Sequence, residues 1–218
     1  MKKILTFISI LLLTFACNKS EQSNSQNQNE ELADDYFKRA KVYFDQENYE
    51  AAVSLLDSAL LNQSNHISSI ATRASAFYNL EDYDGALADY NKAIELWPTD
   101  EANRAALTSL YLERGDTYYT LKKFDLAISD LTKVIEMDPG NTVAYVYRGD
   151  ARDNAGLQKE AIEDYTKAIE LDPSNDSAFY NRAVTKQNMK DQIGACEDFK
   201  KAAELGNQEA EPFAAQCK

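Results

Sequence analysis

The sequence predicts an all-α fold, an α-solenoid of about five helix-turn-helix repeats with a C-terminal capping helix. The first observation is an amphipathic pattern over residues 160–175, where Ala161, Tyr165 and Ala168 fall at i, i+4 and i+7 and so share one helix face. Pro173 ends this helix, and Asn175 can cap the next one. The residues expected on the opposite, solvent-facing side are Glu163, Asp164, Lys167 and Glu170.

The second observation is that this pattern recurs along the chain at a constant spacing. Leu131 holds the place of Tyr165 one repeat earlier, and Tyr90 marks a copy displaced by seven inserted residues. Two end copies, centred on Leu56 and Phe199, lack the closing proline. The third observation is that the segments ahead of these helices also agree, as in Tyr111 with Arg114-Gly115, Tyr145 with Arg148-Gly149, and Phe179 with Arg182-Ala183.

These positions resemble the tetratricopeptide repeat (TPR) family, whose period of about 34 residues and whose alanine, aromatic and proline signature have this form. The resemblance covers residues 33–209 and departs from the family pattern in having no tryptophan at the usual first aromatic site. It implies a binding function carried by the concave face that the first helices of the repeats build together. The predicted TPR domain spans 33–218, with repeats at about 33–66, 67–100, 108–141, 142–175 and 176–209 and a cap at 208–218.

The seven inserted residues, 101–107, read E-A-N-R-A-A-L and contain only helix formers. The simplest interpretation is that they lengthen the third repeat's first helix at its start, and an extra rigid loop is the alternative. Ala102, Ala105 and Ala106 would then project and offer a docking place for a partner or for a second copy in a homo-oligomer. Just before the insertion, Trp97 is expected to pack in the turn rather than anchor a partner.

Two cysteines flank a glycine near the C-terminus. Cys196 stands ten residues before Gly206, and Cys217 stands eleven after it, so a turn at Gly206 would bring the sulfurs level. In an oxidising compartment they would form a disulfide worth about 3 kcal/mol, and two unpaired thiols are the alternative. Gly115 and Gly149 sit mid-helix, where a close helix crossing would explain them.

Residues 1–17 predict an export signal. Lys2 and Lys3 precede an apolar run of twelve residues, which is too short to span a bilayer permanently. Cys17 follows Ala16, and its position resembles that of the lipidated cysteine of bacterial lipoproteins, although an ordinary signal-peptidase site at residues 14–16 remains open. Residues 18–32 are expected to form a flexible polar linker. The lipoprotein resemblance implies a lipid anchor in the bacterial cell envelope, at the periplasmic or surface side of the outer membrane.

Charge and motif content argue against several function classes. The formal net charge is −13, from 36 acidic and 23 basic residues, and such a surface repels nucleic acid. His66 is the only histidine and is expected to be exposed, so no metal site is predicted. No glycine-rich phosphate loop and no nucleophile with a histidine at motif spacing occurs. The sequence therefore predicts a protein that is not an enzyme and needs no cofactor.

The stripe beside the packed face of the first helices is expected to line the binding groove. Aromatic rings beside carboxylates suit a peptide with apolar and basic side chains, although Phe44 and Tyr78 could instead only pack between repeats. Lys41 is the only basic member, which argues against the chaperone-carboxylate grip of some family members. The stripe consists of Phe37, Lys41, Phe44, Ala71, Ser75, Tyr78, Leu112, Asp116, Tyr119, Val146, Asp150, Asp153, Tyr180, Val184 and Gln187.

Three functions fit these observations. The first is an envelope-tethered scaffold that mediates protein–protein interaction by binding a peptide or protein segment in its groove. The second is a soluble, exported, self-associating chaperone or adaptor, which would lack diacylglycerol on Cys17. The third is a hydrolase that uses clustered carboxylates, which would require a carboxylate pair with strongly perturbed pKa values inside a pocket.

Overall fold

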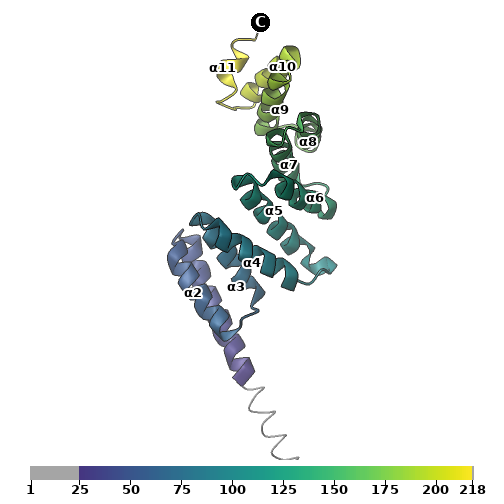
Figure 1. The fold of residues 1–218 in the computed structure, drawn as a ribbon. Helices are drawn as coiled ribbons and strands as arrows, with labels where there is room; N and C mark the ends of the chain where they lie inside the picture. The colour runs from purple at the N-terminus through teal and green to yellow at the C-terminus, as the bar shows by residue number, and fades with distance from the viewer. Residues whose placement is uncertain (1–24, 218) are drawn as a thin grey trace, which may run out of the picture. The chain divides into compact units, whose positions relative to one another are not determined.

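The computed structural model describes residues 25–217, and every regular element in that range is helical (Figure 1). The predicted signal segment, Cys17 and the first part of the predicted linker lie outside the described residues. A first helix covers residues 25–45. It is followed by α2 (Tyr49–Asn62), α3 (Ile67–Asn79), α4 (Tyr83–Leu96), η1 (Glu101–Asn103), α5 (Arg104–Thr120), α6 (Phe124–Met137), α7 (Thr142–Asn154), α8 (Gln158–Leu171), α9 (Asp176–Asn188), α10 (Gln192–Glu204) and α11 (Glu211–Ala214).

The described part of the chain divides between Leu96 and Trp97 into two compact units, called unit 1 and unit 2. In unit 1 the described residues hold the first two helical hairpins, and α3 packs against both α2 and α4. Unit 2 holds three hairpins, α5–α6, α7–α8 and α9–α10, followed by α11 packed on α10. The sequence predicted one domain over 33–218, and the structure divides this range into two units. Each unit is built of consecutive packed helix pairs, as the fold class predicts.

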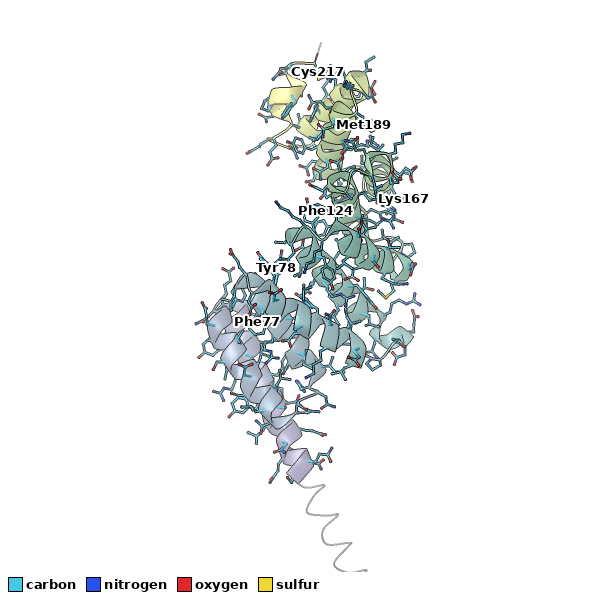
Figure 2. All side chains as sticks on the ribbon, viewed as in Figure 1. Phe77, Tyr78, Phe124, Lys167, Met189 and Cys217 are labelled. Carbon is cyan, nitrogen blue, oxygen red and sulfur yellow. A yellow bond between two sulfur atoms is a disulfide. The ribbon has the colours of Figure 1, made fainter. Side chains whose placement is uncertain are left out.

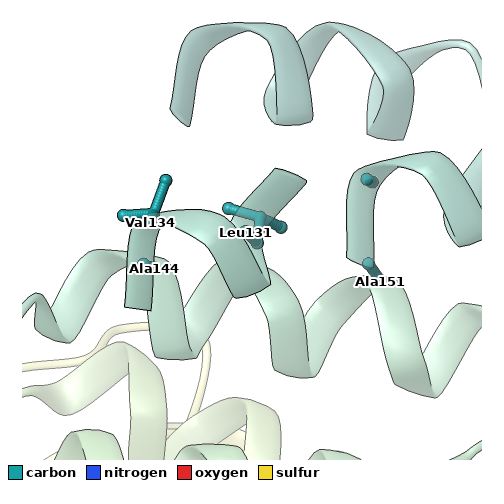
Figure 3. Packing of buried hydrophobic residues seen from close by; sticks show 5 residues of the cluster. Leu131, Val134, Ala144 and Ala151 are labelled. Atoms are coloured by element: carbon teal, nitrogen blue, oxygen red, sulfur yellow. The ribbon is translucent and has the colours of Figure 1, made fainter. Parts of the chain in front are cut away.

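Alanines at the helix crossings let neighbouring helices approach, and one large side chain fills each gap between them. In unit 2, Leu131 and Val134 of α6 form a core cluster with Ala144 and Ala151 of α7 (Figure 3). In the next hairpin Tyr165 is buried against Gly149, where an added Cβ would lie 2.6 Å from the ring's Cε1 atom. The close crossing that was expected to explain this mid-helix glycine is therefore present.

The turn inside each hairpin uses a left-handed residue at the same repeat position. The φ angles at these residues lie between 57° and 81°. Only the fourth repeat places a glycine there, so the other four hold an L-residue in a conformation that favours glycine. The residues are Glu47, Glu81, Lys122, Gly156 and Lys190.

Two expectations at the edges of the repeats need correction. Residues 25–32 of the predicted flexible linker are helical, because this stretch contains no glycine or proline and continues the helix in which Ala33 is fully buried. The insertion does lengthen the third repeat's first helix at its start, since α5 has 17 residues and α7 has 13, but its first three residues form η1 instead of joining α5. Asp100 caps η1 by accepting from the Asn103 N–H. The indole N–H of Trp97 donates to the Asn103 side chain at 3.1 Å, which places Trp97 in the turn.

Candidate partner-binding surface

The first helices of unit 2 lie next to one another, since α5 contacts α7 and α7 contacts α9. They carry a group of carboxylates and tyrosines that we call the acidic surface: Asp116, Tyr119, Tyr147, Asp150 and Asp153. Tyr147 is 39% exposed, and the other four residues are half-buried. Asp116 and Asp150 occupy the same position in consecutive repeats, because the repeat pattern sets their register. Tyr147 was not among the residues expected from the sequence.

Asp150 is the most perturbed member of the acidic surface. The Tyr165 hydroxyl donates to its Oδ1 atom at 2.7 Å, and the Asn181 amide donates to the same atom at 2.8 Å. Burial raises the pKa of this carboxyl to about 6, these two hydrogen bonds oppose the rise, and Asp153 adds repulsion. Among the described residues, two neutral groups, one from α8 and one from α9, donate to this carboxylate.

The neighbours of Asp150 add to the negative potential. Burial raises the pKa of Asp153, whose Oδ1 atom is buried without a hydrogen-bond partner among the described residues. Burial and the nearby carboxylates raise the pKa of Tyr119 and of Tyr147. None of the described ion pairs involves Asp150 or Asp153. Among the described residues, Asp150 and Asp153 therefore have no basic side chain paired with them, and a cation brought by a ligand would interact favourably with both.

A second set of carboxylates was missed by the sequence analysis. Asp164, expected on the solvent side of its helix, is buried and accepts from Arg148 Nε at 3.0 Å and Nη2 at 2.7 Å. Arg152 also reaches it at 2.6 Å. The aspartate follows its arginine at one constant spacing in every pair, and this spacing is the signal that could have identified the pairs. The same bidentate pair occurs at Arg73–Asp89, Arg114–Asp130 and Arg182–Asp198.

The structure gives the remaining predicted groove residues of unit 2 mixed roles. Val146 belongs to a buried core cluster, so its side chain is not displayed for a partner. Leu112 and Val184 pack against such clusters from their edges. Tyr180 leans on the rings of Phe199 and Phe213, with centroid distances of 5.9 and 6.4 Å. The three predicted aspartates, Asp116, Asp150 and Asp153, are half-buried and belong to none of these core clusters.

The predicted groove residues of unit 1 are mostly packing residues. Phe44 lies edge-on to Tyr49 at 5.3 Å, and Tyr78 lies edge-on to Tyr83 at 5.6 Å. Each ring therefore packs onto the second helix of its own hairpin. Lys41 is exposed and Phe37 is half-buried.

His66 is not exposed as expected, because its side chain is only 13% accessible and it holds the N-cap position of α3. Its Nδ1 atom lies 2.7 Å from Ser69 Oγ, and its Nε2 atom lies 3.1 Å from Asp34 Oδ1. The residue types are those of a serine hydrolase. However, Ser69 is fully buried, so a substrate cannot reach its hydroxyl. The contact instead ties the first helix to α3 within unit 1.

Within residues 25–217, no cluster of three or more histidine, cysteine or acidic side chains is arranged to hold a metal ion. None of the helices described there is both long enough and apolar enough to cross a membrane. At the C-terminus, Cys196 and Cys217 are joined by a disulfide, with their Cα atoms 5.5 Å apart. Of the two alternatives that the cysteine spacing left open, the structure therefore has the bonded one.

Three models of known protein families match segments of this chain. Models described as tetratricopeptide repeat match residues 71–100 and 108–141, and a model described as TPR repeat matches residues 149–190. These segments lie in the second to fifth predicted repeats. The search of curated proteins finds no match.

Solved structures show the same fold. The crystal structure of YrrB, described as a TPR protein with an unusual peptide-binding site, is 22% identical and superposes with a TM-score of 0.73. The superposition covers 89% of this chain and 97% of YrrB. MamA from Desulfovibrio magneticus RS-1, from residue 41 to its end, is 24% identical with a TM-score of 0.73, covering 79% of this chain and 94% of that one. At these identities the likeness supports the fold only.

Proposed function

Because the chain is a tetratricopeptide-repeat protein, as its sequence predicted, we propose that it is a non-catalytic scaffold that binds partner proteins through the first helices of unit 2. The observation that carries this proposal is the acidic surface, where Asp150 and Asp153 have no basic partner among the described residues. Such carboxylates favour a ligand that brings its own cations. The similarity in fold to YrrB, a TPR protein with a peptide-binding site, agrees with a peptide-binding role.

The partner that fits best is a segment with basic side chains next to apolar or aromatic ones. Lysine or arginine would pair with Asp116 and Asp153, and the exposed face of Tyr147 would accept either an apolar contact or a cation. An acidic segment or a free carboxylate would be repelled. This polarity also disfavours nucleic acid as a partner, since phosphates would meet the same carboxylates.

A binding measurement with two charge-matched double variants tests the proposal. The probe is a soluble peptide of alternating lysine and tyrosine, with a glutamate–tyrosine peptide as the negative ligand. Asp116→Asn/Asp153→Asn should weaken binding of the basic probe about tenfold or more, which is on the order of 1.4 kcal/mol. Glu163→Gln/Glu197→Gln removes two charges from positions of α8 and α10 outside the acidic surface and should leave affinity unchanged. Equal binding by both double variants would show that the acidic surface is not the site.

We propose further that the scaffold is held at a bacterial membrane by lipid on Cys17. The support is the sequence, in which a basic start and a twelve-residue apolar run end at Ala16-Cys17. A diacylglycerol anchor would add about 0.8 kcal/mol per buried CH₂ group. Mass spectrometry of the mature N-terminus decides the question, because an unmodified chain beginning at Cys17 or beyond would exclude the anchor while leaving the binding proposal intact.

A further inference from the structure

A small pocket lies at the C-terminal end of unit 2, between α9, α10 and the segment that ends at Cys217. Figure 2 labels Cys217 at this end of the unit. Its volume is about 170 Å³. The rings of Phe199 and Phe213 and the Cys196–Cys217 disulfide form its walls. No charged side chain lines it, and its polar lining residues are glutamines. The pocket therefore presents uncharged aromatic, sulfur and amide groups to whatever enters it.

The volume limits what can enter. Sites for whole small molecules usually measure about 300–1,000 Å³, well above this pocket. An apolar cavity of about 150 Å³ is large enough to hold benzene. The pocket is therefore matched to one benzene-sized group, such as the ring of phenylalanine or the branched end of leucine, and not to a cofactor or a metabolite.

The C-terminal cap builds one wall of the pocket, and the disulfide holds this cap in place. Helix α11 has only four residues, too few to be stable alone. Phe213 stacks on Phe199 with ring centroids 4.7 Å apart and planes 14° apart, and Cys217 is bonded to Cys196 of α10. The pocket thus exists in this form because a covalent bond keeps α11 against α10.

The pocket borders the same stripe of first helices that bears the acidic surface. Gln187 of α9, one of the lining residues, takes the repeat position that Asp153 holds in α7. Because α7 contacts α9, a polypeptide that lies across these helices would reach both places. We propose that the pocket binds one apolar side chain of a partner polypeptide, giving the partner an uncharged anchor beside its basic contacts.

This anchor goes beyond the acidic surface and is tested without it. The probe is N-acetyl-phenylalanine amide, with N-acetylglycine amide as the negative ligand, titrated into the full chain and followed by NMR at Ala195 and Phe213. The expected result is saturable, millimolar binding of the phenylalanine probe with shifts confined to the pocket. Absence of saturable shifts at these two residues would overturn the proposal.

A second test compares a variant that blocks the pocket entrance with a matched variant one repeat earlier. Gln192 is the first residue of α10, and Gln158 holds the same position in α8 one repeat earlier. Gln192→Trp should weaken probe binding about tenfold or more, and Gln158→Trp should leave it unchanged. Equal affinity in the two variants would refute the pocket as the site. If the unliganded chain is instead a dimer that Gln192→Trp separates in sedimentation, the occupant is a second copy and the proposal is wrong.

Opening the disulfide provides an independent test. A dithiol reagent transfers two electrons and two protons to the Cys196–Cys217 bond, which becomes two thiols while the reagent closes to its own disulfide. Reduction, or the Cys196→Ser/Cys217→Ser variant, should weaken the phenylalanine probe about tenfold as α11 is released. Unchanged affinity after complete reduction, verified by thiol counting, would contradict the role given to the cap.

Discussion

Asp164 and Asp150 belong to the same repeat, but the buried Asp164 is paired with arginines and the half-buried Asp150 is not. Asp164 lies between two arginines, with ion-pair distances of 2.7 Å to Arg148 and 2.6 Å to Arg152. Among the described residues, Asp150 accepts from a tyrosine hydroxyl and an asparagine amide and pairs with no cation, and burial raises its pKa to about 6. The charge of Asp164 is neutralised by two arginines, whereas no described ion pair neutralises the charge of Asp150.

Within this one hairpin, Asp164 stabilises the fold, and Asp150 belongs to the surface for which we propose a binding role. A buried charge that is paired and hydrogen-bonded holds two helices in register. A buried charge without a counter-ion destabilises the folded chain unless a bound ligand supplies the opposite charge. The fifth repeat shows that the fold does not need the second arrangement. At the phase of Asp150 and Tyr165 it has Val184 and Phe199, which pack as part of an apolar cluster.

The largest effect is expected when the compensated carboxylate is removed. Asp164→Ala leaves Arg148 and Arg152 in a mostly buried site without their shared acceptor, so the free energy of unfolding should fall by about 3 to 5 kcal/mol in urea denaturation. Glu163→Ala, at the neighbouring position outside this network, should change it by less than about 0.5 kcal/mol. A loss of the same small size in both variants would remove the contrast between the two aspartates.

The next effect comes from neutralising Asp150. Its folded pKa of about 6 lies above its ordinary value of 3.8, so the folded state holds the proton more tightly than the unfolded chain. This carboxyl therefore favours folding below pH 4, and that contribution disappears as the pH rises through 6. Between pH 4 and pH 7 the wild type should lose on the order of 3 kcal/mol of unfolding free energy relative to Asp150→Asn. A pH-independent difference would contradict the uncompensated state of Asp150.

A smaller effect is expected from removing one donor. Tyr165→Phe keeps the buried ring but deletes the hydroxyl that donates to Asp150 at 2.7 Å. Because this hydrogen bond lowers the pKa of Asp150, the variant should titrate above the wild-type value of about 6 in an NMR pH titration of the carboxyl carbon. At pH 7 its unfolding free energy should drop by about 2 kcal/mol. An unshifted or lowered titration midpoint would show that the hydroxyl does not support the carboxylate.

The smallest effect is expected at the edge of the arginine network. Arg148 Nη1 donates to the Thr132 hydroxyl at 3.1 Å, which links the fourth repeat to the third. Thr132→Val should cost about 1 kcal/mol of unfolding free energy. Thr108→Val is the matched control and should be near neutral, because the Thr108 hydroxyl donates to the Arg104 carbonyl of its own helix. If both variants behave alike, the threonine adds nothing to the pairing of Arg148.

The sequence predicted the repeated hairpins because each helix shows its own amphipathic pattern, and this pattern recurs along the chain. It also contained the arginine–aspartate pairs, since the register of a tight hairpin keeps the two members of each pair at one spacing, but a helical-face assignment placed Asp164 in solvent. Asp150 could not be understood in the same way. Its state depends on Tyr165 and Asn181, which belong to the next two helices and whose side-chain directions the pattern leaves open. The pocket at Cys217 likewise depends on the angle of a short cap.

The disulfide also determines how unit 2 responds to mechanical load. Solenoids lose their end elements first, because a terminal helix has a neighbour on one side only. A pull on the C-terminus enters the chain at Cys217 and passes through the sulfur bridge directly into α10, bypassing the loop at Gly206. Helix α11 lies between the two bonded cysteines, so it carries no part of this load while the disulfide is intact. An oxidising environment thus converts the weakest end of the unit into a mechanically protected one.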